Sequence, residues 1–363
     1  MEKRAMTAAA IIIASAIAMA AGMPRMLGGT PKFEVKKKIT LGGEGGWDYL
    51  KYDPDGKRVF ISRATHTIVF DPASGKQVGD IPNTNGVHGI ALVPELGKGF
   101  ISDGRDNQVT VFDLKSLKQT ATVPTSAGPD AIMYEPLTKR VFTMDGHASD
   151  ATGIDAATNK VVGKIPLAGK PEFAVADGRG VVFVNIEDKS EMQAFDAKTL
   201  KVLHTWPMGK CDSPSGLAID TKRRRLFAGC DNKEMAILDA DTGKVLAEPA
   251  IGEGVDACGF DPGLNLAFSS NGQDGNLTVI KEEGGDKFAV VQNLETEKGA
   301  RTMTLDEKSH TIYTVTAKFG PVPTTLAGAK TAPSGGPGSA GQRRPSIVPG
   351  TFEVIVVGMK GRF

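Results

Sequence analysis

Short apolar runs, each separated from the next by turn-forming residues, occupy most of the chain. Residues 109–112 (Val-Thr-Val-Phe) and 235–238 (Met-Ala-Ile-Leu) are examples. Each run has the length of one strand and is bounded by residues such as Gly, Pro, Asn and Asp. Gly and Pro number 44 and 21, enough for many tight turns. The pattern predicts an all-β protein built from many short antiparallel strands.

A turn motif recurs between neighbouring apolar runs. Its pattern is Asp-x-x-Ser/Thr, then Gly, Asn or Leu, then Lys, and it repeats about every 42 residues. The Asp side chain can accept backbone hydrogen bonds in the turn, while Gly and Asn tolerate positive φ. Each motif therefore predicts a tight turn between two strands. The motifs begin at Asp71, Asp113, Asp155, Asp196 and Asp239.

A second marker follows the same period and gives the number of repeats. Seven strands contain a Phe or Tyr near their start, and another apolar strand lies just upstream of each. Units of about 42 residues with four antiparallel strands indicate the blades of a β-propeller. Seven units predict a seven-bladed β-propeller over residues 33–363. The seven marker strands are residues 59–63, 99–103, 141–145, 182–186, 226–230, 267–271 and 312–316.

The last unit lacks its outer strand. The chain ends after a third apolar strand at residues 352–357, while a spare strand at residues 33–41 precedes the first unit. Pairing the two would leave neither with a free sheet edge. We therefore expect the N-terminal strand to complete the last blade and close the ring.

The N-terminal residues have the features of an export signal. Lys3 and Arg4 precede an apolar run at residues 8–21, and the segment from Ala18 to Ala20 supplies small residues for cleavage. We expect residues 1–22 to be a signal peptide and the mature protein to be periplasmic or secreted, with no transmembrane span after cleavage. An uncleaved membrane anchor is the alternative.

The charge balance argues against a nucleic-acid partner. Lys and Arg number 43 against 42 Asp and Glu, whereas nucleic-acid modules carry a strong basic excess. In an oxidising compartment the three cysteines can form one disulfide. Cys211 and Cys230 lie at the same end of one predicted hairpin and are the candidate pair. Simple pairing sets Ser215 opposite Cys230, so the loop must fold back. Cys258 is expected to be a buried thiol.

Polar residues begin the innermost strands. In a propeller these positions surround the central channel, and a gapless alignment places one residue per blade in a single ring. The ring is either solvated polar lining, a charge network around Arg301, or a binding site for a small polar ligand or a divalent cation. Carboxylates and one imidazole fit a hard or borderline metal, with Asp48, His88 and Asp130 from successive blades as its ligands. The ring residues are Asp48, His88, Asp130, Glu172, Ser215, Asp256 and Arg301.

No motif in the sequence identifies a reaction. Crowded carboxylates repel one another, which raises the pKa of some of them. One of them acting as a general base on a metal-bound water would give lactonase-like hydrolysis. The chain contains no GxSxG elbow and no CxxCH haem motif. Whether the protein is an enzyme stays open at this point.

Residues 318–350 interrupt the last blade. They are rich in Pro, Gly and Ser and cannot form a core of their own. We expect a flexible insertion on the face that contains the ring. It is either a lid or partner-docking segment, in which Arg343 and Arg344 approach the acidic mouth, or a solvated spacer.

The repeats also resemble a known family. The Phe-rich second strand, the Val-x-Val-Phe-Asp third strand and the Asp-x-x-Thr-Gly-Lys turn are similar to those of the YVTN-repeat, YncE-like β-propellers. This resemblance covers nearly all of residues 33–363. It implies a periplasmic seven-bladed propeller and no particular reaction.

Our interpretation of the sequence is an exported, monomeric binding module. Its ligand would be a small polar molecule, a metal ion or a protein partner, bound through the upper face and the central channel. A metal-dependent lactonase-like hydrolase and a redox-associated scaffold are the two alternatives, because propellers of both kinds are known and fold alone does not decide function.

Overall fold

The computed structural model describes residues 29–321 and 346–361. All the described strands lie in one compact unit, Lys32–Phe363. The whole of the expected signal peptide, residues 1–22, and the central part of the 318–350 insertion are outside the described residues. The described part of the chain contains no helix with the length and apolarity needed to cross a membrane.

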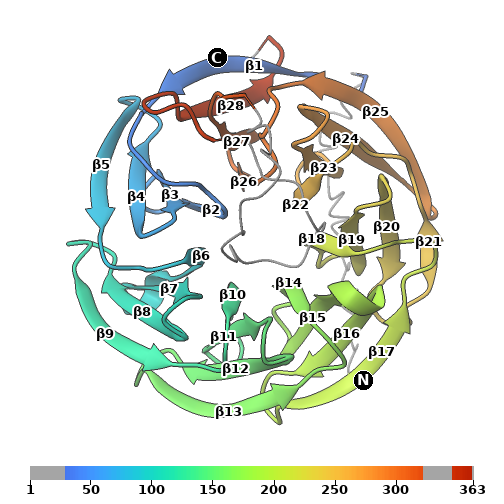
Figure 1. Cartoon of the computed structure of the whole chain (residues 1–363). Helices are drawn as coiled ribbons and strands as arrows, with labels where there is room; N and C mark the ends of the chain where they lie inside the picture. Colours follow the sequence, from blue (N-terminus) through green and yellow to red (C-terminus); the bar gives the residue numbers. More distant parts are fainter. Residues whose placement is uncertain (1–28, 322–345, 362–363) are drawn as a thin grey trace, which may run out of the picture. The chain divides into compact units, whose positions relative to one another are not determined.

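Seven four-stranded antiparallel sheets surround a central channel, as Figure 1 shows. In each blade the strands follow one another outward from the channel in chain order, except in the last. This arrangement confirms the seven-bladed β-propeller. Blades 1 to 3 contain β2 (Leu50–Asp53), β3 (Arg58–Arg63), β4 (His66–Asp71), β5 (Lys76–Ile81); β6 (Val87–Val93), β7 (Lys98–Asp103), β8 (Gln108–Asp113), β9 (Gln119–Pro124); and β10 (Pro129–Glu135), β11 (Arg140–Asp145), β12 (Asp150–Asp155), β13 (Lys160–Pro166).

The remaining four blades follow the same plan. Two short 3-10 helices, η1 (Pro94–Leu96) and η2 (Glu187–Lys189), are inserted in blades 2 and 4. The strands are β14 (Pro171–Ala176), β15 (Val181–Ile186), β16 (Glu191–Asp196), β17 (Lys201–Pro207); β18 (Pro214–Asp220), β19 (Arg225–Cys230), β20 (Glu234–Asp239), β21 (Val245–Ala247); β22 (Val255–Asp261), β23 (Leu266–Asn271), β24 (Asn276–Gly284), β25 (Lys287–Glu295); and β26 (Met303–Asp306), β27 (Thr311–Thr316), β28 (Glu353–Met359) with β1 (Phe33–Thr40).

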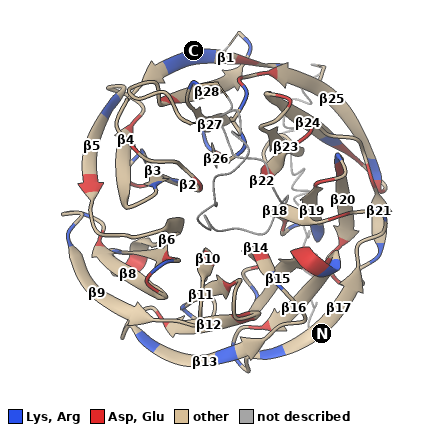
Figure 2. Ribbon diagram, viewed as in Figure 1, with Lys and Arg blue, Asp and Glu red and all other residues tan. Residues whose placement is uncertain are grey.

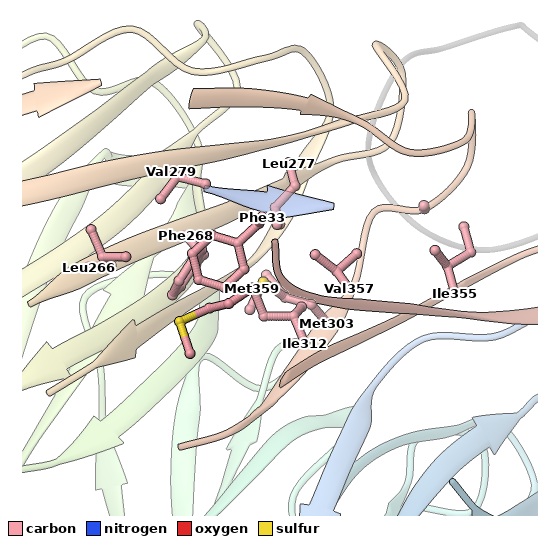
Figure 3. Close-up of a cluster of buried hydrophobic side chains, with 12 residues drawn as sticks. Phe33, Leu266, Phe268, Leu277, Val279, Met303, Ile312, Ile355, Val357 and Met359 are labelled. Atoms are coloured by element: carbon pink, nitrogen blue, oxygen red, sulfur yellow. The ribbon is translucent and has the colours of Figure 1, made fainter. Parts of the chain in front are cut away.

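The ring closes through the N-terminal strand, as the sequence predicted. β1 pairs antiparallel with β28, from Phe33 opposite Met359 to Thr40 opposite Glu353, so the last sheet has the order β1-β28-β27-β26. Figure 3 shows Phe33 among the buried side chains of blades 6 and 7. Its ring meets Phe268 edge-on at 5.3 Å. Closure therefore rests on side-chain packing as well as on backbone pairing.

Each blade has an aromatic residue at the same place in its second strand. Six are Phe residues that are almost completely buried, and the seventh, Tyr313, is 6% exposed. These rings fill the space between neighbouring sheets, where large apolar side chains contribute most to burial. This role explains the marker that recurred along the sequence. The six Phe residues are Phe60, Phe100, Phe142, Phe183, Phe227 and Phe268.

The repeated Asp begins the outer hairpin turn in blades 1 to 5. At Asp113 the side chain accepts hydrogen bonds from the backbone N–H and the hydroxyl of Ser116, both at 2.7 Å. These bonds hold the pKa of Asp113 below its usual value. Asp155 makes the same two contacts with Thr158, at 2.8 and 2.7 Å. The turn chemistry expected from the sequence is present.

Candidate functional site

The seven residues aligned from the sequence lie at the starts of the inner strands. We call the end of the channel where these strands begin the upper face, and the end where they finish the lower face. His88, Asp130 and Asp256 are the second residues of β6, β10 and β22. Asp48 and Arg301 precede β2 and β26 by two residues. We call the seven the channel ring.

One side of the channel ring is an aspartate–histidine–aspartate cluster. His88 Nδ1 lies 2.6 Å from Asp48 Oδ2 and 3.5 Å from Asp130 Oδ1. Burial alone would lower the pKa of His88, but the charges of Asp130 and Asp48 and the hydrogen bond to Asp48 raise it to about 9. At neutral pH the imidazole is therefore protonated and donates to Asp48.

Arg301 forms the second cluster. Its Nη1 donates to Asp256 Oδ2 at 2.7 Å and its Nη2 to Asp48 Oδ1 at 3.2 Å. The Ser215 hydroxyl lies 3.4 Å from Asp256 Oδ1. Burial works against ionisation of Asp48, but the contacts with His88 and Arg301 hold its pKa below the usual value. Asp48 thus links the two clusters and is the ring carboxylate with the best compensation.

Lys170 joins the channel ring from outside the alignment. Its Nζ lies 3.0 Å from Glu172 Oε2 and also forms an ion pair with Glu187. Residues two apart on an extended chain point the same way, so Lys170 and Glu172 share a face. That spacing was a signal that our sequence analysis did not use. Lys170 supplies the third cation at this end of the channel.

Three ring carboxyls keep raised pKa values in spite of these cations. Burial raises the pKa of Asp130, and the charge of Asp48 adds to the effect. Burial and the charge of Asp130 raise the pKa of Glu172 well above its usual range. The pKa of Asp256 rises to about 6, mainly because the group is removed from solvent, although the charge of Arg301 opposes the shift. The channel ring therefore contains more half-buried carboxyls than its cations compensate.

Second strands fix the backbone of ring residues in neighbouring blades. The Ser102 hydroxyl, from β7, donates to the carbonyl of Asp130. Asn185 of β15 donates to the carbonyl of Ser215 at 2.7 Å, and Ser270 of β23 donates to that of Arg301. Each contact runs from one blade to the next. The ring is consequently held by the packing of blades and not by loops alone.

The loop before Asp48 is held by a buried arginine. Arg63 is 2% exposed and donates to the carbonyls of Gly42, Glu44 and Gly45. Its guanidinium lies 3.7 Å from the centre of the Phe352 ring. Burial lowers the pKa of Arg63 to about 10. Backbone carbonyls thus take the place of a counter-ion for Arg63. The same hydrogen bonds hold the loop that leads to Asp48.

Two aromatic side chains meet across the channel directly below the ring. Tyr49 follows Asp48 in blade 1 and Phe173 follows Glu172 in blade 4, and their ring centres are 5.2 Å apart in a stacked arrangement. Burial, together with the charges of Asp130 and Glu172, raises the pKa of Tyr49 well above its usual value. The hydroxyl is thus within the field of the ring carboxylates. We call these two residues the aromatic floor.

A cavity of about 670 Å³ lies on the other side of the aromatic floor. All seven inner strands line it, and both Tyr49 and Phe173 belong to its wall. None of the seven ring residues does. Exposed residues that follow the inner strands, including Gly178, Thr221 and Glu307, form its lower end. The channel therefore has a polar upper part and a separate lower cavity whose wall is both apolar and polar.

The expected metal ligands come together. Ligand atoms of Asp48, His88 and Asp130 lie within 4.8 Å of one another, and these three form a group that could hold one ion. The Nδ1 that would bind the ion is the atom that contacts Asp48. A divalent cation would have to displace the imidazole proton, so its affinity should increase with pH.

The cysteines form one disulfide near the upper face. Cys211 and Cys230 are joined, with their Cα atoms 5.4 Å apart, and Cys258 is a buried thiol. Pro214, rather than the expected Ser215, lies opposite Cys230, because the pairing of β18 with β19 shifts between Pro214 and Leu217. The bulge moves the loop by one residue relative to the simple hairpin.

The remaining aromatic and imidazole side chains have structural contacts. Trp47 packs against Phe352 and Phe319, at 5.5 and 6.1 Å between ring centres. His310 Nδ1 lies 2.6 Å from Asp261 at the opposite face. His204 stacks on Trp206 in the outer strand β17. None of these contacts involves a channel-ring side chain.

Comparison with known proteins supports the fold and goes no further. No family model matches the chain, and no curated protein matches it. Among solved structures, the WD40 repeats of RRP9 align with a TM-score of 0.70 at 11% identity, covering 91% of this chain and 100% of that chain. The structure of U3-55K aligns with a TM-score of 0.69 at 12% identity, covering 90% of this chain and 99% of that chain. The hydrazine synthase of Kuenenia stuttgartiensis aligns with a TM-score of 0.68 at 12% identity, covering 76% of this chain and 93% of that chain.

Proposed function

We propose that this protein is an exported binding module whose channel ring takes a small cationic ligand from the upper face. The ligand is a divalent metal ion or an organic ammonium group. The observation behind this proposal is the surplus of half-buried carboxyls: Asp130, Glu172 and Asp256 have raised pKa values although Arg301, His88 and Lys170 lie beside them. A cation would relieve their mutual repulsion and replace the protons that burial favours.

The resemblance to the YVTN-repeat, YncE-like propellers belongs to the same proposal, as do the signal peptide and the monomeric state. On this proposal the ring of a single chain faces a periplasmic or extracellular space, where small ligands reach it from the upper face. A Lys or Arg side chain of a partner protein would meet the same carboxyls and would be a larger version of the same ligand.

A thermal-shift screen tests the ring. The probes are Mg²⁺, Ca²⁺, Mn²⁺, Zn²⁺ and butylammonium at pH 7.5. A ligand at about 100 times its Kd stabilises the fold by roughly 2.7 kcal/mol, which is measurable as a rise in Tm. At least one probe should stabilise the native protein and fail to stabilise the Asp130→Asn, Glu172→Gln variant. Glu283→Gln, at an exposed residue of blade 6, is the matched control. No shift with any probe would contradict the proposal.

Metal-dependent hydrolysis is a second candidate because Asp48, His88 and Asp130 converge on one point. A bound ion at this place would lower the pKa of a coordinated water, and Glu172, a carboxyl with a raised pKa outside this group of ligands, would act as the base. Opening of a simple lactone should then require a divalent metal and disappear in both His88→Ala and Asp130→Ala. Metal binding without lactone opening would leave the protein a binding module.

A further inference from the structure

A lysine lines the lower cavity. Lys51, in β2, lines the cavity and is exposed within it. Among the described residues it forms no ion pair within 4 Å. Burial of this part of the chain lowers the pKa of Lys51, and the charge of Glu307 only partly opposes the shift. An anion placed beside Lys51 would be favoured for the same reason.

Slightly more than half of the cavity wall is apolar, and its polar part includes Asp177, Thr304 and Glu307 as well as Lys51. Met133, Val175 and Leu305 are half-buried and line it together with the more deeply buried Cys258 and Met303. A volume of about 670 Å³ is in the range of cavities that hold small organic molecules. Such sites combine an apolar wall with a few polar groups that fix the ligand's orientation. Lys51 is the polar group that this cavity offers to an anion.

We propose that the lower cavity is a second binding site, for a small amphipathic molecule with an apolar body and one carboxylate group. The apolar body lies against Met133, Val175 and Met303, and the carboxylate meets Lys51 toward the lower face. The aromatic floor of Tyr49 and Phe173 separates this ligand from the channel ring. The site therefore does not depend on the function proposed for the ring.

Ligand chemistry provides the first test. The probes are hexanoate, octanoate, decanoate and the neutral octanol, with affinities measured by calorimetry on the full chain. Each added methylene should tighten carboxylate binding about threefold to fourfold, the equivalent of burying one CH₂ group. Octanoate should bind at least tenfold more tightly than octanol, because a charge-assisted hydrogen bond to Lys51 is lost in the alcohol. Equal affinity for the two, or no binding of decanoate, would overturn the proposal.

A charge variant tests the role of Lys51. Lys51→Met keeps the length of the side chain and removes the ammonium, so it should lower octanoate affinity at least tenfold and leave octanol affinity unchanged. Lys160→Met, at an exposed residue of the outer strand β13, is the matched control and should leave both affinities unchanged. Unchanged octanoate binding by Lys51→Met would refute the carboxylate contact.

Methionine signals locate the ligand without altering the cavity. In protein labelled with ¹³C at the methionine methyl groups, octanoate should shift the signals of Met133 and Met303, which line the cavity. Met208, buried beside the disulfide, should not move. Signals would be assigned by Met→Leu substitution at each position. Shifts at Met208 alone would place the ligand elsewhere and overturn the proposal.

Discussion

The upper and lower parts of the channel are built from the same seven strands but have different chemistry. The channel ring gathers four carboxyls, Arg301 and His88, whereas the wall of the lower cavity is slightly more than half apolar, and its Lys51 forms no ion pair within 4 Å among the described residues. In Figure 2 acidic and basic segments are spread around the whole propeller, including the blue Lys36–Lys38 run of the outer strand β1. The difference between the two parts lies in the residues that line the channel.

Only two large side chains lie between the upper and the lower part of the channel. In a gapless alignment, the residues that follow the ring positions are Tyr49, Gly89, Ala131, Phe173, Gly216, Ala257 and Thr302. Only Tyr49 and Phe173 are large, and they come from blades on opposite sides of the channel and stack. The two large residues of this layer thus separate the channel ring from the lower cavity.

Removing the aromatic floor should have the largest effect on the free energy of unfolding. Tyr49→Ala with Phe173→Ala deletes a half-buried aromatic pair, and we expect a loss of about 4 kcal/mol in the free energy of unfolding, toward the upper part of the range for aromatic truncations. Urea denaturation at pH 7 measures it. Tyr49→Phe keeps the stack and should cost less than about 1 kcal/mol. If the double variant were no less stable than Tyr49→Phe, the floor would not contribute to the fold.

Breaking the ring's ion pairs should have the next largest effect. Arg301→Met leaves Asp48 and Asp256 without their shared cation, and we expect a loss of about 2 kcal/mol at pH 8, less than for a fully buried pair because Arg301 is partly exposed. At pH 5 the loss should be smaller, since Asp256 has a pKa of about 6 and is then largely protonated. Arg105→Met, at an exposed upper-loop residue, should change stability by less than about 0.5 kcal/mol.

Buried carboxyls outside the ring should make the protein less stable as pH rises. Asp103, at the end of β7, accepts a hydrogen bond from Thr110 at 2.6 Å, and burial raises its pKa to about 7. The unfolded value is about 3.9, so the folded state binds the extra proton between about pH 4 and 7. Stability should fall across this interval and then level off. Asp145 has the same environment and a pKa of about 7.

Blade 6 supplies a natural control for this effect. Asn271 occupies the position of Asp103 and donates to Thr278 at 3.0 Å. Asp103→Asn should therefore be tolerated, and it should raise the free energy of unfolding at pH 8 by about 1 kcal/mol while changing it little at pH 4. Urea denaturation at both pH values measures the difference. A variant that lost stability equally at both would show that Asp103 is ionised in the native state.

The last prediction concerns the protonation of His88. Its folded pKa of about 9 lies above the unfolded value of about 6.5, so its contribution to stability is fully present below pH 6.5 and is lost as pH rises through 9. NMR titration of the imidazole, assigned with His88→Gln, should give a value near 9. Asp130→Asn removes one of the charges that raise it and should lower it toward the ordinary range. A native value near 6.5 would show that the ring carboxylates do not act on His88.

The sequence predicted the fold and the composition of the ring because both follow from a regular repeat. A turn Asp and a buried second-strand Phe recur in most blades, and the start of each inner strand can be aligned from them. The β-bulges that follow several ring positions, as between Pro129 and Ile132, do not disturb the alignment, because they begin at the ring. The strand register before the bulges was less predictable: Pro214, and not the expected Ser215, lies opposite Cys230.

The aromatic floor and the lower cavity were not predicted. A contact between Tyr49 and Phe173 depends on the width of the channel, which follows from the packing of all seven blades and not from any local pattern. Lys170 was missed for a different reason, since it lies outside the aligned strand positions although its spacing from Glu172 was informative. The identity of a ligand is not encoded in the repeat.

Calorimetric titration at pH 6.5 tests the claim that the channel ring is a cation site most directly. Mn²⁺ and butylammonium would each be added to the full chain in two buffers with different heats of ionisation. We predict that at least one binds with net release of protons, because it replaces protons on Asp130, Glu172 or Asp256, and that the Asp130→Asn, Glu172→Gln variant loses this binding. Absence of binding by both probes, or binding that releases no protons and persists in the variant, would contradict the account.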